Sequence, residues 1–244
     1  MFTHQSSPMV LDRARAAVVL TDMQNDFLAP TGGAYGQIAE SMAKHDTANN
    51  LERLLAAAKR HQLKVFISPH YYYPHDHKWA APSTPIEDLA HQIGLLSRTD
   101  PLSVNGFENS GADFPARYKP YICDGETIVT SPHKAYSAST NDLILQLRRY
   151  RIEQVILAGP VGNLCVEAHM RDCIEHGFEV AMVRDATAGA MTEYGDGYDA
   201  AMINWRFMAH ALWTTQQVIA MLDAPAVAKA GPAAQPAKAR ARAA

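Results

Sequence analysis

Residues 154–173 read QVILAGPVGNLCVEAHMRDC, and this stretch contains the pattern from which the fold is predicted. Its first five residues are an apolar run of the length expected for a buried strand. From Cys165 onward, apolar residues recur at helical spacing. Glycine and proline between the two parts indicate a tight turn. The stretch therefore predicts a strand, a turn and a helix, with a thiol where the helix starts.

A thiol in this position is a candidate nucleophile. The start of a helix carries partial positive charge and free backbone N–H groups, which lower the pKa of a thiol and can hold an oxyanion. We therefore expect Cys165 to attack a substrate, and a base to be supplied by another part of the chain. A cysteine taken alone is more often a small buried apolar residue, which is the expectation for Cys123 and Cys173.

Apolar runs of strand length alternate with longer segments of helical period along the chain. The predicted strands are 16–21, 64–68, 127–130, 154–158 and 179–183, with a short sixth strand at 212–214. The predicted helices are 47–61, 86–96, 139–150, 165–176 and 197–211, with a last helix ending at about residue 222. This alternation is typical of helices covering both faces of a parallel sheet. We predict an α/β fold of three layers, α/β/α and Rossmann-like, around a mostly parallel six-stranded sheet.

The length and composition predict one large domain. The chain has 244 residues, of which 48% are hydrophobic and 19% charged. We assign residues 1–222 to this domain and expect 223–244, rich in Ala, Pro, Lys and Arg, to be a disordered tail. Residues 70–124 form a connection far longer than usual, with many aromatic residues, histidines and prolines. Such loops are usually functional, so we expect it to form the lid or wall of a pocket.

Charge and cysteine content limit the classes of partner. With 22 Lys and Arg against 25 Asp and Glu, the net charge of −3 does not favour nucleic acid. The first residues lack a signal-peptide pattern and no stretch is long enough to span a bilayer, so we expect a cytoplasmic protein with no membrane partner. The 3 cysteines cannot all pair and do not resemble a disulfide framework, so reduced thiols are expected.

Three polar residues follow three of the predicted strands. Asp22 follows 16–21, Lys134 lies just beyond 127–130, and Cys165 comes after 154–158. In an open parallel sheet, ligands bind beyond the carboxyl ends of the strands, so these side chains are expected to converge. A carboxylate can take the proton of a thiol, and an ammonium group beside them stabilises both anions. Asp22 alone fits a helix cap equally well, and Lys134 alone fits a solvated surface charge.

The same three segments resemble the isochorismatase-like cysteine hydrolases, which include nicotinamidases, N-carbamoylsarcosine amidase and ureide hydrolases. The matching segments are DMQNDF (22–27), KAYSA (134–138) and GPVGNLCV (159–166). The resemblance extends over about residues 16–222 and is weakest in the long loop. It implies the isochorismatase-like hydrolase fold and a catalytic triad of Asp22, Lys134 and Cys165.

The resemblance also implies a mechanism. Cys165 would attack a carbonyl and Asp22 would move protons, with an oxyanion hole from the backbone N–H groups of Val161 and Cys165 beside a cis peptide between Pro160 and Val161. An amine or ammonia would leave, and water would hydrolyse the acyl-cysteine thioester. The resemblance implies a C–N hydrolase acting on a small amide, carbamoyl or ureide, without an organic cofactor, assembled as a homodimer or homotetramer.

The chain departs from the family pattern in two places. Many relatives have threonine and aspartate where this chain has Gly162 and Asn163. Nicotinamidases bind a metal through an Asp-x-His and further histidines after the second strand, but the corresponding segment here has no such aspartate. We therefore expect no metal, with a zinc site formed by His70, His75 and His77 as the alternative.

Substrate specificity is the least defined part of the prediction. The residues assigned to the substrate pocket are Phe27, Tyr35, Trp79, Tyr136 and Gln24, with core packing or support of the helix start as the alternative role. Two other functions stay open at this point. The same groups could hydrolyse another bond, such as an ester or an isochorismatase-like ether. An exposed, low-pKa thiol could also serve as a redox sensor without catalysis.

Overall fold

The computed structural model describes residues 9–225 of the chain. The main sheet has six strands in the order β3-β2-β1-β4-β5-β8, and every pair of neighbours is parallel. Their bounds are β1 Ala16–Thr21, β2 Lys64–Ser68, β3 Ile128–Val129, β4 Gln154–Pro160, β5 Glu179–Ala188 and β8 Ala211–Trp213. The sheet confirms the predicted fold class and all six predicted strands, although β3 is shorter and β4 and β5 are longer than expected.

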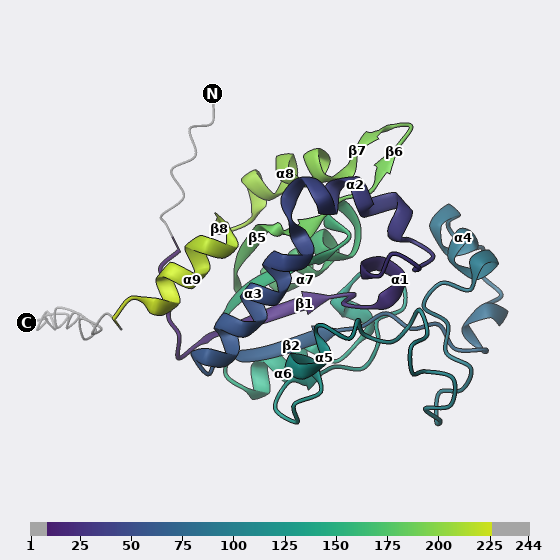
Figure 1. Cartoon of the computed structure of the whole chain (residues 1–244), viewed down its shortest axis with the longest axis horizontal. Helices are drawn as coiled ribbons and strands as arrows, with labels where there is room; N and C mark the ends of the chain where they lie inside the picture. Colours follow the sequence, from purple (N-terminus) through teal and green to yellow (C-terminus); the bar gives the residue numbers. More distant parts are fainter. Residues whose placement is uncertain (1–8, 226–244) are drawn as a thin grey trace, which may run out of the picture.

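Helices cover both faces of this sheet (Figure 1). In β1, Val18 and Leu20 pack on the face covered by α2, α3 and α9, while Ala17 and Val19 pack on the face covered by α6, α7 and α8. Strands buried on both faces read as continuous apolar runs, which is why they were recognisable in the sequence. The bounds are α2 Tyr35–His45, α3 Thr47–Arg60, α6 Leu143–Arg149, α7 Glu167–Glu175, α8 Gly197–Met208 and α9 Thr215–Asp223.

Two predicted helices differ at their start, two others (86–96 and 197–211) end earlier than predicted, at Ile93 and Met208, and three helices were not predicted: α2 and the four-residue helices Asn25–Leu28 and Lys119–Ile122. The segment 139–150 contains a 3₁₀ turn, η2 Ala138–Thr140, before α6, and the helix with Cys165 begins earlier, as the π-helical turn η3 Gly162–Val166 before α7. The longest of these unpredicted helices is α2, which buries only three residues of its length, Ile38, Ser41 and Met42. Its apolar stripe is too short to indicate a helix from sequence periodicity alone.

The long connection between β2 and β3 has structure of its own. It contains η1 Asp76–Lys78, α4 Pro85–Ile93 and α5 Lys119–Ile122, and α4 lies at the edge of the molecule toward which β1 points (Figure 1). The loop closes on itself at a neck: the N–H of Tyr72 donates to the carbonyl of Leu96 over 3.1 Å, and the N–H of Arg98 donates to the carbonyl of Tyr72 over 2.8 Å. The connection is therefore an ordered lobe beside the sheet.

The remaining elements are short: α1 Asn25–Leu28 and the two-stranded hairpin β6 Met191–Thr192 and β7 Gly195–Asp196. Residues 226–244, most of the predicted tail, lie outside the described residues. Within residues 9–225, no helix is both long and apolar enough to cross a membrane.

Candidate active site

The site begins where β1 ends. Asp22 is fully buried and has a left-handed backbone with φ 51°. A non-glycine residue in this region is uncommon and costs free energy, and such residues concentrate at functional sites. The neighbouring β4 approaches closely at Gly159, where a Cβ would lie 2.3 Å from the carbonyl oxygen of Thr21. Glycine at this position lets the two strand ends, and the residues that follow them, come together.

Cys165 lies in η3, on the turn that follows β4. Its side chain is buried, with 5% exposed, and its thiol interacts with the backbone N–H groups of Val161 and Cys165. These are the two N–H groups that the family resemblance assigned to an oxyanion hole. The peptide between Pro160 and Val161 is cis, as the resemblance implied. The turn therefore places two backbone donors beside one sulfur atom, as acyl transfer requires.

The electrostatics of the thiol differ from the sequence-based expectation. Burial, followed by the negative charge of Asp22, raises the pKa of Cys165 well above its ordinary value, although the N–H groups of Cys165 and Val161 act to lower it. Burial also raises the pKa of Asp22. Burial raises the pKa of the thiol more than the helix start lowers it, because the charged form of a fully buried group is strongly disfavoured. Cys165 is therefore favoured as a protonated thiol, and the carboxylate of Asp22 beside it has an increased proton affinity.

The residue that contacts Asp22 is His133, not Lys134. Nε2 of His133 donates to Oδ1 of Asp22 over 2.8 Å, and both side chains are fully buried. Lys134 turns away: its Nζ forms an ion pair with Asp76 and donates to the carbonyl of Tyr71 over 2.9 Å. The expected convergence of Lys134 with Asp22 and Cys165 is therefore not present, and the lysine ties down the long loop instead.

A repeated tripeptide could have identified His133 from the sequence. Ser-Pro-His occurs at 68–70, at the end of β2, and again at 131–133, just after β3. Because β2 and β3 are parallel neighbours, the two tripeptides lie side by side, and His70 and His133 form a β-bridge. Their ring centroids are 4.6 Å apart. Identical motifs at the ends of adjacent parallel strands place identical side chains next to each other.

Three buried histidines surround Asp22 and Cys165. Burial lowers the pKa of His70 and of His133 to about 3, and that of His169 to about 4. At neutral pH these imidazoles are uncharged, so they cannot supply the positive charge expected from a lysine. His169 supports the turn instead: Nδ1 donates to the carbonyl of Cys165 over 2.7 Å, and Nε2 contacts Oγ of Ser68 over 2.8 Å.

The segment 22–27 connects this centre to the long loop. The side-chain amide of Gln24 pairs with the backbone of His70, donating to its carbonyl over 2.7 Å and accepting from its N–H over 2.9 Å. The carboxylate of Asp26 accepts from the N–H of Leu96 over 2.6 Å and from that of Gly33 over 3.1 Å. One short motif therefore positions the histidine after β2 and anchors the far side of the loop.

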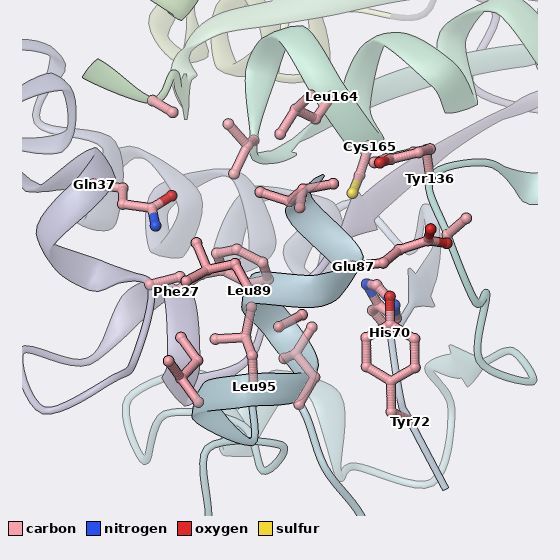
Figure 2. A pocket seen from close by; sticks show the side chains of 18 residues that line it. Phe27, Gln37, His70, Tyr72, Glu87, Leu89, Leu95, Tyr136, Leu164 and Cys165 are labelled. Atoms are coloured by element: carbon pink, nitrogen blue, oxygen red, sulfur yellow. The ribbon is translucent and has the colours of Figure 1, made fainter. Parts of the chain in front are cut away.

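A pocket opens beside Cys165, with about 610 Å³ of empty space including its mouth. We use the name polar floor for His70, Val161 and Cys165, which line the pocket, together with Asp22 and His133, which contact these residues without lining the pocket. Helix α4 and the residues after it form the opposite side, the apolar wall: Ile86, Leu89, Ala90, Ile93, Leu95 and Leu96. Figure 2 shows Cys165, His70, Glu87 and Tyr136 toward one side, and Phe27, Leu89 and Leu95 toward the other.

Two of the five residues predicted for the pocket line it. Phe27 and Tyr136 belong to the lining. Tyr35, Trp79 and Gln24 do not: Tyr35 packs against the core, Trp79 is 45% exposed, and Gln24 supports His70 from behind. The residues that sequence reasoning missed belong mainly to α4 and the residues just after it, whose position depends on contacts distant in sequence.

The three histidines proposed for a zinc site do not come together in the described residues. His70 lies in the polar floor, but the side chain of His75 is 64% exposed and contacts Asp76, while His77 packs against the rings of Tyr72 and His91. A different set of metal-ligating side chains is adjacent. Among residues 9–225, the potential ligand atoms of Asp22, His70, His133 and Cys165 all lie within 4.8 Å of one another.

Comparison with known proteins identifies the family and agrees with the fold. The model of the isochorismatase domain family matches residues 16–217. A curated relative, the ureidoacrylate amidohydrolase RutB of Variovorax paradoxus, is 24% identical over 183 residues, which are 74% of this chain and 71% of that protein. An uncharacterized isochorismatase family protein, YddQ of Bacillus subtilis, is 27% identical over 85 residues, 34% of this chain and 47% of its own length.

Solved structures show the same fold. A cysteine hydrolase from Pseudomonas syringae pv. phaseolicola superposes with a TM-score of 0.70 at 22% identity, covering 89% of this chain and 98% of its own. An isochorismatase family protein from Desulfovibrio vulgaris gives 0.66 at 22% identity, covering 86% and 99%. At these identities the likeness establishes the fold.

Proposed function

Because the chain belongs to the isochorismatase family, we propose that it is a cysteine-dependent hydrolase that cleaves the C–N bond of a small amide carrying an apolar group. The observation that carries the proposal is the sulfur of Cys165, which lies in a pocket beside the buried carboxylate of Asp22 and two backbone N–H groups. A nucleophile, a base and oxyanion donors are the groups that acyl transfer needs. The amidohydrolase relative supports C–N cleavage.

In the first half-reaction, Asp22 accepts the proton of the Cys165 thiol while the sulfur attacks the carbonyl carbon. The raised pKa of Asp22 favours this transfer, since a carboxylate with higher proton affinity is a better base. The backbone N–H groups of Val161 and Cys165 hold the oxyanion. The C–N bond then breaks, the amine leaves with the proton returned by Asp22, and Cys165 is acylated.

In the second half-reaction, water hydrolyses the thioester. Asp22 takes a proton from the attacking water, and the resulting tetrahedral intermediate again places its oxyanion at the N–H groups of Val161 and Cys165. The C–S bond breaks and the thiolate of Cys165 recovers the proton from Asp22. Carboxylate, thiol and backbone donors return to their starting states, so the cycle needs no other proton source.

His133 takes the place in the triad that the sequence assigned to Lys134. Its hydrogen bond to Oδ1 of Asp22 fixes the carboxylate while leaving Oδ2, which accepts no hydrogen bond of ordinary geometry within residues 9–225, available for proton transfer. Since His133 is uncharged, it orients Asp22 without lowering its proton affinity as strongly as an ammonium would. We infer that His133 is a positioning residue.

The pocket lining indicates the substrate class. Its side chains are mainly apolar, and in the described part of the chain neither lysine nor arginine contributes to the lining, in which Glu87 is the charged carboxylate. A substrate anion would therefore enter without a partner for its charge, at a cost in desolvation. We propose an uncharged acyl or amine group with an apolar portion against the apolar wall, rather than a carboxylate such as a ureidoacrylate.

The redox-sensor alternative is less well supported. Reactive sensor cysteines are exposed and have low pKa values, whereas Cys165 is buried and its pKa is raised. Ester hydrolysis uses the same groups and is tested by including esters among the substrates.

The test is amine or ammonia release from a panel of small amides and ureides, neutral apolar and carboxylate-bearing, with matched esters. Wild-type protein should release amine, and Cys165→Ala should not, because no sulfur remains to attack. Intact-mass analysis should detect an acyl adduct on wild-type protein only.

Cys123→Ala is the matched control, because Cys123 is exposed and lies outside the pocket lining. It should retain full turnover. Amide turnover that persists in Cys165→Ala, or equal loss in both variants, would refute the proposal.

A further inference from the structure

Four potential metal ligands converge on the polar floor from the ends of four neighbouring strands. Asp22 follows β1, His70 follows β2, His133 follows β3, and Cys165 follows β4. All four side chains are buried, and their ligand atoms lie within 4.8 Å of one another. We propose that these residues form a binding site for a single zinc ion. This site shares only His70 with the loop site considered from the sequence.

The donor set selects zinc by its chemistry. Zinc in proteins is typically bound by four ligands drawn from thiolate, imidazole and carboxylate, all of which are present here. Calcium and magnesium instead require six or more ligands, mostly oxygen, and only Asp22 among the four residues offers oxygen. The thiolate of Cys165 together with two imidazoles favours a borderline-soft transition ion.

Within residues 9–225, two polar atoms of this cluster accept no hydrogen bond of ordinary geometry, although the carboxylate of Asp22 interacts with the thiol of Cys165. They are Oδ2 of Asp22 and Nδ1 of His133, both on side chains with no exposed surface. Buried polar atoms are nearly always satisfied, and an ion is one explanation for those that are not. This observation is independent of the spacing of the four residues and indicates the same place.

The surrounding contacts prepare His70 for coordination. Nε2 of His70 contacts the carbonyl of Lys134 over 2.8 Å, which fixes the proton on this nitrogen and leaves Nδ1 as the ligand atom. Metal-bound histidines commonly donate their second nitrogen to a backbone carbonyl in this way. Gln24 fixes the backbone of the same residue.

The four ligand atoms need to move only a short distance to coordinate the ion. Ligand atoms around tetrahedral zinc are roughly 3.5 Å apart, so the widest pair must approach by on the order of 1 Å. The S–H bond of Cys165 is broken and a Zn–S bond forms, and the proton is released to solvent.

The binding test uses the full chain after removal of metal with a chelator, titrated with Co²⁺ and then with Zn²⁺. We expect one Co²⁺ per chain, with a thiolate-to-cobalt charge-transfer band in the near ultraviolet that Zn²⁺ abolishes by displacement. Bound Zn²⁺ should also protect Cys165, but not the exposed Cys123, from alkylation by iodoacetamide. Neither readout requires the proposed hydrolase activity.

Variants identify the ligands. Cys165→Ser should eliminate the charge-transfer band, and His70→Ala should weaken Zn²⁺ binding by more than about 100-fold, since outer-sphere partners alone contribute about 10–100-fold. Cys123→Ser and His75→Ala are the matched controls and should bind like wild type. If His70→Ala does not fold by circular dichroism, the near-isosteric Cys165→Ser decides the question.

Substoichiometric binding, a charge-transfer band that survives in Cys165→Ser, or a larger loss in His75→Ala than in His70→Ala would overturn the proposal. Loss of hydrolysis alone would not support it, because the same residues serve the proposed reaction. Metal binding without amide turnover would support the zinc site and refute the hydrolase instead.

Discussion

The polar floor and the apolar wall of the pocket are built in opposite ways. The side chains of Asp22, His70 and His133 in the floor are buried, and each makes a hydrogen bond from the end of a sheet strand. In the wall, Leu89 is 37% exposed and Ile93 is 47% exposed, on a helix outside the sheet. Preorganised groups act on charge that develops during a reaction, whereas a partly exposed apolar surface can adapt to different ligands. From this comparison we expect the floor to determine the chemistry and the wall to determine the substrate.

The largest expected effect is in the floor. Asp22→Asn removes the proton acceptor but keeps the shape of the side chain, so kcat should fall by about 10²–10⁴-fold, the usual contribution of general acid–base catalysis. Steady-state kinetics on the best substrate of the panel would measure this fall. A decrease in kcat of less than about tenfold would show that another group accepts the thiol proton.

His133 and Lys134 provide an internal test of the floor, because they are adjacent in sequence but contact different partners. His133→Ala removes a hydrogen bond to a charged group, which contributes about 1.5–3 kcal/mol, so kcat should fall by about 10–100-fold. The pH profile of kcat should shift as well, since the environment of Asp22 changes. Lys134→Ala removes the contact with Asp76 and should change kcat less. If the lysine variant has the larger loss and shifts the pH profile, the sequence-based triad is correct.

A smaller effect is expected in the wall. Ile86→Ala removes part of the apolar lining, and each buried methylene contributes about 0.8 kcal/mol, so kcat/KM for an apolar amide should fall on the order of tenfold. The smallest amides, which do not reach the wall, should be almost unaffected. Ile203→Ala on the exposed surface of α8 is the control. Equal losses for large and small amides would contradict a role in selectivity.

The last prediction concerns the pH dependence of stability and involves no change in turnover. His70 and His133 have folded pKa values of about 3 against an ordinary value of 6.5, so the unfolded chain binds more protons in this interval. The free energy of unfolding should therefore fall as pH falls below about 6.5, with at most one proton per histidine in the slope. The raised pKa of Asp22 acts in the opposite direction above 3.8. Urea unfolding at several pH values should give a shallower slope for His133→Gln and an unchanged slope for Ile86→Ala.

The sequence predicted the sheet well because its signals are local. Strands such as β1 are buried on both faces, so their apolar runs are visible without knowledge of their neighbours. The turn with Cys165 was recognisable because its glycine and proline residues are also local signals. The identity of the third polar group was not predictable in this way. Whether His133 or Lys134 faces Asp22 depends on the side-chain direction just after a very short strand, β3, which apolar periodicity does not define.

Which residues of the long loop form the wall was beyond sequence reasoning for a different reason. Periodicity located a helix at 86–96, close to the observed α4, but its position in space depends on contacts such as the bond from the N–H of Leu96 to Asp26, 70 positions apart in the sequence. Nothing in the sequence around Tyr35 and Trp79 indicates that these two aromatic side chains lie outside the pocket lining. Long-range hydrogen bonds, rather than residue type, decide which side chains of the loop line the pocket.

The neck of the long loop gives residues 73–97 the properties of an exchangeable module. The two sides of the neck, Tyr72 and the segment 96–98, are joined by hydrogen bonds between backbone atoms only. These bonds therefore do not depend on residue type. Segments whose ends lie close together tolerate insertion and replacement better than segments that span the core. A new loop joined at the same neck could carry another wall while the sheet ends that hold Asp22 and Cys165 stay in place. Such exchange offers a route by which one catalytic centre acquires new substrates, in natural divergence or in the laboratory.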